Sequence, residues 1–145
     1  MSNTKRTVAI ISSIVLVILL SLCTFLVIKH MNRHKIDSDR VEKITFWSYS
    51  FDEQEMNAHD TETFIKLYNK AKYGGEATGE GGTPEYGVNV YFIDGTRLII
   101  YPFGSVRHDF EVALYDANEP ENDWYYVDSQ DLYQFVSEII TNANQ

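Results

Sequence analysis

The longest apolar segment of the chain lies near its N-terminus, from Thr7 to Ile28. Its 22 residues carry no charged side chain, and a helix of that length spans roughly 33 Å, enough to cross the hydrocarbon core of a bilayer. The pattern therefore predicts a transmembrane helix over residues 7–28. A short tail over residues 1–6 precedes it, and a polar juxtamembrane linker over residues 29–40 follows it.

Two processing signals compete with an uncleaved anchor. A cleaved signal peptide has a shorter apolar run followed by small residues, whereas residues 25–28 of this run are FLVI. A lipoprotein signal would place a small residue before Cys23, where this chain has Leu22. We therefore predict an uncleaved signal anchor, with Cys23 as a small apolar residue inside the span.

Residues 41–87 show a strand pattern, then a helix pattern, then a glycine-rich segment. β-Branched and aromatic residues predict a strand over residues 41–51, followed by an acidic loop over residues 52–58. Asp60 is the expected N-cap of a helix over residues 61–73 that ends at Gly74. Its apolar stripe at i, i+3, i+4 and i+7 consists of Phe64, Leu67, Tyr68 and Ala71. Residues 74–87 contain six glycines and are expected to form a long loop.

A β-hairpin is predicted over residues 86–103, with its turn at Asp94-Gly95. A two-residue turn would place Arg97 on the same face as the apolar residues of the first strand. A three-residue loop over residues 93–95, with Gly95 in the left-handed region, instead pairs Val88 with Ile100 and Val90 with Leu98. Burial of one face favours this second register, because a slip of one residue exchanges the two faces.

Two more strands, over residues 109–116 and 124–127, precede a last helix. Asp128 or Ser129 caps this helix, which continues to about residue 141 and has the strongest apolar stripe after the membrane span. The sequence thus predicts an α+β domain over residues 41–145 with the order β-α-β-β-β-β-α. Its sheet is expected to be mainly antiparallel, with two helices packed on one face.

Charge is distributed unevenly along the chain, whose net charge is −9. Residues 1–40 carry a net charge of +4, whereas residues 41–145 hold six basic and nineteen acidic residues, a net charge of −13. So acidic a domain does not bind nucleic acid through its phosphates. The single cysteine also excludes an intrachain disulfide and a cysteine-ligated zinc site.

Two observations favour opposite orientations of the span. Two basic residues, Lys5 and Arg6, precede the span and four follow it, which by the positive-inside rule favours a cytoplasmic domain. A short basic tail followed directly by an apolar stretch is nevertheless typical of a signal anchor. We expect a single-pass protein of the cell membrane with an extracytoplasmic C-terminal domain.

Tyrosine-rich positions remain once the helices are packed on one face of the sheet. These residues point away from the predicted core, and they are Tyr91, Arg97, Tyr101 and Tyr115, with Trp47, Tyr49 and Tyr125 as further candidates. Tyrosine and tryptophan combine apolar area with a hydrogen-bonding tip, which suits an interface. The pattern predicts a face that binds a protein or cell-envelope partner. Stabilisation of the sheet by cross-strand pairs is the alternative.

Catalytic and metal-binding patterns are weak in this sequence. The histidines of the domain, His59 and His108, lack the spacing of a zinc site and are expected in solvated loops. The acidic segment 116–123 lacks the glycine and terminal glutamate of an EF-hand, so a solvated turn is favoured over weak calcium binding. We predict no catalytic residues, no metal and no cofactor.

Residues 41–140 resemble small, uncharacterised extracytoplasmic domains of Gram-positive bacteria that a lipid or a single span tethers to the membrane. The matching segments are VEKITF, ETFIKLYNKAK, YGVNVYFIDGTRLIIYPF and WYYVDSQDLYQFVSEII. The resemblance implies a non-catalytic module in the cell envelope. Many members resemble lipoproteins, from which this chain departs at Leu22. The alternatives are a cytoplasm-facing membrane adaptor and an acid-dependent hydrolase.

Overall fold

The computed structural model describes residues 3–145 except 33, 80–81, 104–107 and 119–122. The chain divides into two compact units, residues 1–34 and residues 35–145. The first unit contains one helix, α1 (Asn3–Asn32), which extends beyond the predicted span at both ends. Its segment Ile10–Lys29 is long and apolar enough to cross a membrane, as a membrane anchor or a signal sequence would be. Inside it, the Thr24 hydroxyl donates to the Leu20 carbonyl at 2.8 Å.

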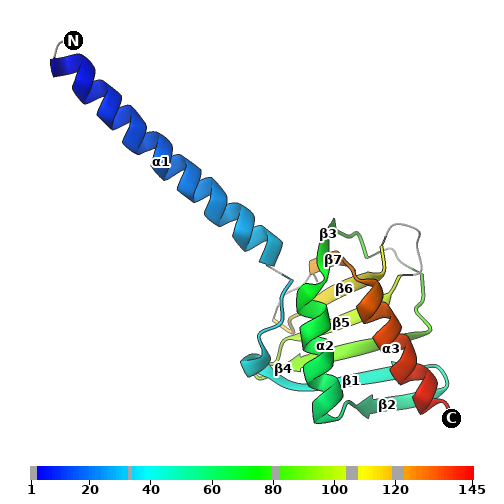
Figure 1. Cartoon of the computed structure of the whole chain (residues 1–145). Helices are drawn as coiled ribbons and strands as arrows, with labels where there is room; N and C mark the ends of the chain where they lie inside the picture. Colours follow the sequence, from blue (N-terminus) through cyan, green and yellow to red (C-terminus); the bar gives the residue numbers. More distant parts are fainter. Residues whose placement is uncertain (1–2, 33, 80–81, 104–107, 119–122) are drawn as a thin grey trace. The chain divides into compact units, whose positions relative to one another are not determined.

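The second unit is an antiparallel sheet with two helices on one face (Figure 1). Among the described residues the strand order is β2-β1-β4-β5-β6-β7-β3, and every neighbouring pair is antiparallel. The strands are β1 (Val41–Ser48), β2 (Phe51–Glu55), β3 (Lys72–Glu76), β4 (Tyr86–Phe92), β5 (Arg97–Pro102), β6 (Phe110–Tyr115) and β7 (Asp123–Asp128). The helices are α2 (Ala58–Lys70) and α3 (Gln130–Ala143). The predicted α+β class is therefore confirmed.

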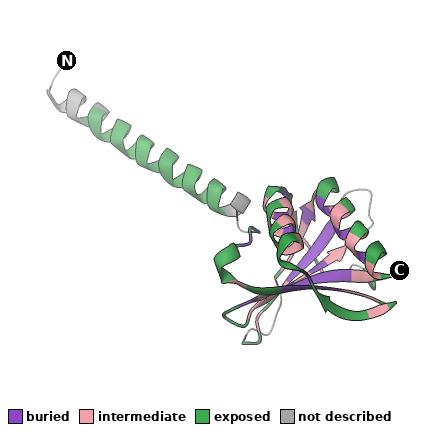
Figure 2. Ribbon diagram, turned by 60° about the horizontal axis from the view of Figure 1, so that its bottom comes forward, coloured by how far each residue is buried: buried purple, intermediate pink, exposed green. Residues whose placement is uncertain are grey.

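The core lies between the helices and the inner face of the sheet (Figure 2). The buried apolar residues of the helices are Phe64, Tyr68, Leu132, Val136 and Ile140, and those of the central strands include Ile44, Val88, Val90, Ile100 and Val112. A buried hydrogen bond at this interface joins the hydroxyls of Tyr68 and Tyr125, 3.0 Å apart. Burial, together with the neighbouring Tyr125, raises the pKa of Tyr68 well above its usual value, so the Tyr68 phenol stays neutral and the hydrogen bond satisfies its buried hydroxyl.

The central hairpin has the register that one-sided burial predicts. Val88 pairs with Ile100 and Val90 with Leu98, and the amide of Phe92 donates to the Thr96 carbonyl at 3.0 Å. Gly95 has a φ of +85°, the left-handed conformation that the three-residue loop requires. This register places Tyr91, Arg97 and Tyr101 on the face of the sheet away from the helices.

The sequence did not predict the two edge strands, β2 and β3. Residues 51–55 form β2 rather than the end of one long strand and an acidic loop, because the chain turns after Ser48 and pairs back on β1. Residues 72–76 form β3 beside β7, in place of the last turn of a helix and the start of a loop. Both are outer strands, and the polar residues of β2 and the glycines of β3 suit an edge that must not bind further strands.

Both helices of the second unit begin with a side-chain cap. Helix α2 starts one turn earlier than predicted, because Asn57 rather than Asp60 is the N-cap and accepts from the Asp60 amide at 2.9 Å. It ends at Lys70 with Ala71 as its C-cap, so the expected stop at Gly74 is wrong. Ser129, one of the two predicted caps, accepts from the Leu132 amide at 3.2 Å and starts α3.

The segment before β1 belongs to the second unit from Lys35 onward, although the sequence analysis assigned it to the linker. Ile36 is buried, and its backbone makes two hydrogen bonds of 2.7 Å with the side chain of Asn69 on α2. Residues 38–40 form a short 3₁₀ helix, and the Ile93 amide donates to the Arg40 carbonyl at 3.0 Å. The chain is thus fastened to the globular unit before the sheet begins.

Asp94 in the hairpin loop is expected to contribute stability that disappears in acid. Hydrogen bonds from Thr96, through its hydroxyl at 2.6 Å and its amide at 3.0 Å, and an ion pair with Arg40 lower the Asp94 pKa from 3.8 to about 2. Because the pKa is lower in the folded chain, the contribution is complete above about pH 4 and is lost as the pH falls to about 2. Asp94→Asn should lower the melting temperature at about pH 6 but have little effect at about pH 2. An equal effect at both pH values would contradict this.

Candidate functional site

The face of the sheet opposite α2 and α3, here called the outer face, carries the candidate site. The register aligns its side chains across β1, β4, β5, β6 and β7 in two groups. One group contains Lys43, Tyr91, Arg97 and Tyr115, each opposite the next on the neighbouring strand. The other is centred on Tyr101. The five predicted site residues, Tyr91, Arg97, Tyr101, Tyr115 and Trp47, all lie on this face but do not form one cluster.

Arg97 lies between two tyrosine rings in the first group. Its guanidinium carbon is 5.8 Å from the centre of the Tyr91 ring and 5.3 Å from that of Tyr115, and Lys43 Nζ is 5.0 Å from the Tyr91 ring. Contacts of this geometry are cation–π interactions. Tyr115 is the exposed member, with 40% of its surface accessible. This group therefore already holds cations against aromatic rings.

Glu53 of β2 covers part of the first group. One of its carboxylate oxygens accepts from the Thr45 hydroxyl, from Asn89 Nδ2 at 2.8 Å and from the Tyr91 hydroxyl at 2.9 Å. Burial raises the Glu53 pKa, but these hydrogen bonds and the charge of Lys43 outweigh it and lower the pKa below its usual value. The hydroxyl and the ring of Tyr91 therefore both contact neighbouring strands. This supports the alternative in which Tyr91 stabilises the sheet as a cross-strand pair.

The second group is a row of aromatic rings across β1, β5 and β7. Tyr101 lies 6.4 Å from Trp47, edge to face, and 6.3 Å from Trp124 in a nearly parallel arrangement, measured between ring centres. Trp47 packs over Gly87, where an added Cβ would lie 2.9 Å from the indole. All three rings are partly exposed, so this group supplies the accessible apolar area that an interface needs.

Trp124 is a residue that the sequence analysis missed. Tyr125, named as a further candidate for the outer face, is only 5% exposed and lies on the core side against Tyr68. The alternation of β7 therefore places Trp124 and Tyr126 on the outer face and Tyr125 and Val127 inside. The alternation of β7 could have indicated this, because the apolar Val127 is expected to face the core and the charged Asp128 to face outward. Counting back in steps of two from each places Tyr125 inside and Trp124 outside.

A pocket of about 400 Å³ opens beside Tyr101 and Trp124. It is lined by Gly79, Gly82, Thr83, Pro84, Tyr101, Pro102, Phe103, Glu111 and Trp124. Glu111 is only 3% exposed, although it lies on the outer face. Burial is the main reason that the Tyr101 pKa is raised above its usual value; the charge of Arg97 lowers this pKa, and the neighbouring Glu111 raises it.

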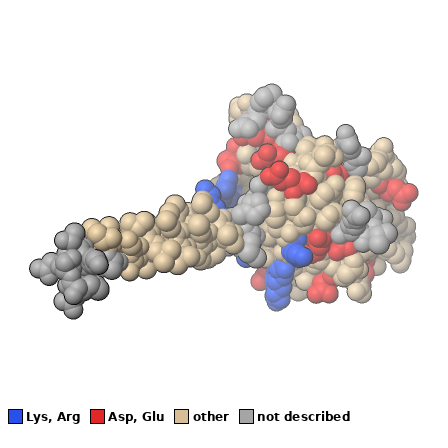
Figure 3. Space-filling view, turned by 90° about the horizontal axis from the view of Figure 1, so that it is seen from above, with Lys and Arg blue, Asp and Glu red and all other residues tan. Residues whose placement is uncertain are grey.

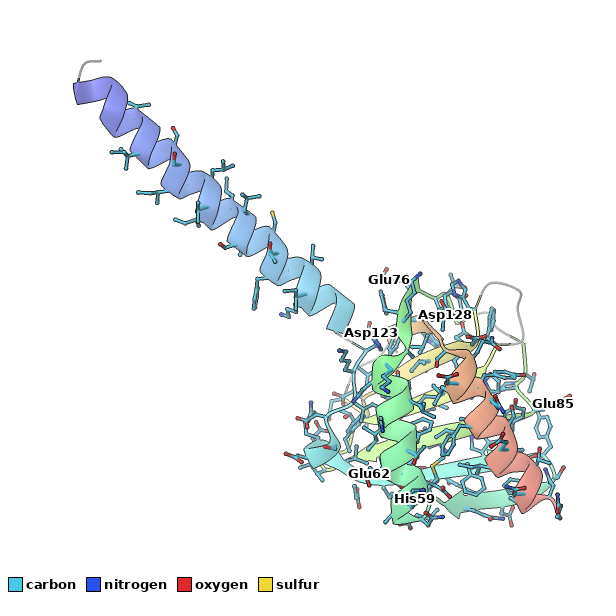
Figure 4. The ribbon with its side chains drawn as sticks, viewed as in Figure 1. His59, Glu62, Glu76, Glu85, Asp123 and Asp128 are labelled. Carbon is cyan, nitrogen blue, oxygen red and sulfur yellow. The ribbon has the colours of Figure 1, made fainter. Side chains whose placement is uncertain are left out.

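The two histidines differ from the expected solvated loop residues. His108 is half-buried, its ring is stacked 4.2 Å from that of Tyr126, and its Nδ1 lies 3.0 Å from an Asp128 oxygen. His59 is exposed but belongs to α2. In Figure 4, His59 and Glu62 lie on α2, away from Glu76 and Asp128 at the β3 edge. No group of three or more metal-ligating side chains occurs among the described residues.

Acidic side chains are spread over the globular unit, as Figure 3 shows for one side of it. Part of the acidic segment 116–123 lies outside the described residues, since these omit 119–122. In the described part, Asp116 Oδ1 accepts from the Asn118 amide at 2.8 Å, as in a polar turn.

No protein-family model, curated protein or solved structure matches this chain.

Proposed function

We propose that this chain is a single-pass, membrane-anchored and non-catalytic module of the cell envelope. Its globular unit lies on the extracytoplasmic side and binds a protein or envelope partner through the outer face of the sheet. The observation that carries the proposal is the row of partly exposed rings formed by Trp47, Tyr101 and Trp124, with Tyr115 at the other end of the same face.

Three features support this function. The apolar helix α1 is long enough to hold the chain in a bilayer. One face of an antiparallel sheet is normally polar when no partner covers it, but this face presents large rings. The resemblance of residues 41–140 to tethered domains of Gram-positive bacteria favours the extracytoplasmic side and the absence of catalysis.

A cytoplasm-facing adaptor on the same anchor is the second candidate. The four basic residues that follow the span, against two before it, favour that orientation under the positive-inside rule. The outer face and its partner-binding role would be the same in both orientations. The two candidates differ only in which compartment supplies the partner.

Photo-crosslinking in intact cells tests the proposal. A benzophenone side chain in place of Tyr115, on the outer face, is expected to form a specific adduct with one partner. The same group in place of Gln134, an exposed residue of α3, is the matched control and should not form it. Protease added outside the cells should then remove the globular unit and its adduct, because both are extracytoplasmic.

The outcomes separate the candidates. An adduct that survives external protease in intact cells, and is digested only after lysis, would support the cytoplasm-facing adaptor. Equal adducts from Tyr115 and Gln134, or none from either, would contradict binding through the outer face.

A further inference from the structure

The first residues of β1 lie at an open edge of the sheet. Strand β2 pairs with β1 only from Thr45 to Ser48 (Figure 1). The amide of Met56, just after β2, donates to the Ile44 carbonyl at 2.9 Å. Within the described part of the chain, residues 41–43 have a partner strand on one side only, which is β4. An edge of this kind presents backbone N–H and C=O groups that another chain can bind.

A groove of about 640 Å³, here called the edge groove, runs along these residues. One of its walls is the start of β1, the other is one side of α2, and the end of β2 closes it at one end. Its apolar floor contains Ile44 and Met56, which are buried, and Val41 and Ile65, which are half-buried. The groove therefore places apolar area directly beside an unpaired stretch of strand.

The backbone edge decides which class of partner fits the edge groove. An acyl chain would cover the N–H and C=O groups of β1 without bonding to them, which costs free energy. The described lining residues include no aromatic ring, so they offer no stacking surface for a base or a sugar. An extended polypeptide segment pairs with the edge through its own main chain and lays alternate side chains on the apolar floor.

Acidic side chains surround the edge groove. Glu42 of β1, Glu55 of β2 and Glu62 of α2 line it, and all three are exposed (Figure 4 labels Glu62). They belong to a domain, residues 41–145, with a net charge of −13. A basic segment is attracted to such a surface, and an acidic segment is repelled.

Two lysines line the edge groove as well, but they do not neutralise it. Lys43 Nζ lies 5.0 Å from the centre of the Tyr91 ring, on the outer face. Lys66 follows Glu62 by four residues on α2, the spacing at which two opposite charges offset each other. The carboxylates of β1 and β2 therefore dominate. A second copy of this chain would bring the same carboxylates to the same edge, so charge disfavours pairing between two copies.

We propose that the edge groove binds an extended segment of a partner polypeptide in which apolar and basic side chains alternate. The segment continues the row that β2 leaves at Glu55 and adds a short strand beside residues 41–43. This site goes beyond the proposed function, because it is separate from the outer face and uses main-chain pairing instead of aromatic rings.

Fluorescence anisotropy with the full chain in nonionic detergent micelles tests the proposal. The probe is a blocked hexapeptide of alternating valine and lysine with a neutral coumarin label, and its counterpart has glutamate in place of lysine. We expect saturable binding of the basic peptide and binding about tenfold or more weaker for the acidic one. Two further versions are N-methylated at every valine or at every lysine. At least one of them should bind about tenfold or more weakly, because methylation removes the main-chain donors along one edge.

A matched pair of variants locates the site. Ala58 is exposed and lines the edge groove, so the indole of Ala58→Trp fills the space and should weaken binding about tenfold or more. The neighbouring His59 is exposed on the same helix but is not among the described lining residues, so His59→Trp should leave binding unchanged.

A second pair tests the charge. Glu42→Gln keeps the shape of the side chain and removes one exposed carboxylate beside the edge, so it should weaken binding of the basic peptide about twofold to fivefold. Glu138→Gln makes the same change at an exposed position of α3 and should leave binding unchanged.

Several results would overturn the proposal. They are the absence of saturable binding of the basic peptide, equal binding of the basic and acidic peptides, and equal binding of both methylated versions and the parent. These comparisons use the unaltered chain, so they hold even if Ala58→Trp fails to fold. Equal effects of Ala58→Trp and His59→Trp in folded protein would place the peptide elsewhere. A dimer in the micelles that only Ala58→Trp dissociates, without peptide binding, would assign the edge to a second copy.

Discussion

Phe64→Ala is expected to lower the free energy of unfolding of the globular unit by about 3–5 kcal/mol. Phe64 is fully buried on the inner side of α2, and its ring lies 6.0 Å from that of Tyr68. The substitution deletes a ring that packs against other buried side chains. It leaves a cavity that the surrounding strands cannot fill without moving. Since small domains are stable by only about 5–15 kcal/mol, this is a large fraction of the total.

Chemical unfolding of the full chain in detergent micelles, followed by near-ultraviolet circular dichroism, measures this loss. Glu62→Ala, at an exposed position of the same helix, is the matched control and should change the free energy by less than about 0.5 kcal/mol. A denaturation midpoint for Phe64→Ala close to that of the control would show that α2 contributes little to the core.

The inner face of the sheet was predictable because burial acts on one side of each strand. In the hairpin, the apolar residues Val88, Val90, Leu98 and Ile100 share a face in only one register, and the structure has that register. The same reasoning placed Tyr91, Arg97 and Tyr101 outside. Local patterning suffices there because both strands of the hairpin are close in sequence.

The edge strands were not predictable from patterning. In β2, residues 52–55 are all exposed and include three acids, so no alternation distinguishes this strand from a loop. Two of the five residues of β3, Gly74 and Gly75, have low strand propensity. Pairing with β1 and β7 forms these strands, and that is tertiary information.

Only part of the candidate site could be predicted, because the rest also depends on tertiary pairing between strands. The outward direction of Tyr101 follows from the period of β5, but its partners Trp124 and Glu111 come from strands whose pairing the sequence does not reveal. The contact of Gly79 with Trp124 joins residues 45 positions apart. No local pattern indicates that the glycine-rich segment lines a pocket.

Introducing two arginines into α1, Leu16→Arg together with Leu19→Arg, is expected to abolish stable membrane insertion. Both residues lie inside the apolar segment Ile10–Lys29, where their side chains are exposed to whatever surrounds the helix. An arginine at the centre of a membrane helix costs about 2.5–3.5 kcal/mol, so the pair costs about 5–7 kcal/mol. The double variant should appear in the soluble fraction after alkaline carbonate extraction, or be degraded, whereas the unchanged chain stays with the membranes.

The control is Leu16→Ile together with Leu19→Ile, which keeps the segment apolar and should remain in the membrane fraction. The mass of the mature wild-type product, measured in both the membrane and the soluble fraction, then separates an anchor from a signal sequence. An uncleaved anchor keeps α1 attached to the globular unit, whereas a cleaved signal leaves a product that lacks it. Retention of the double-arginine variant in carbonate-washed membranes would mean that another part of the molecule holds it there. In that case α1 would lose its role as the anchor.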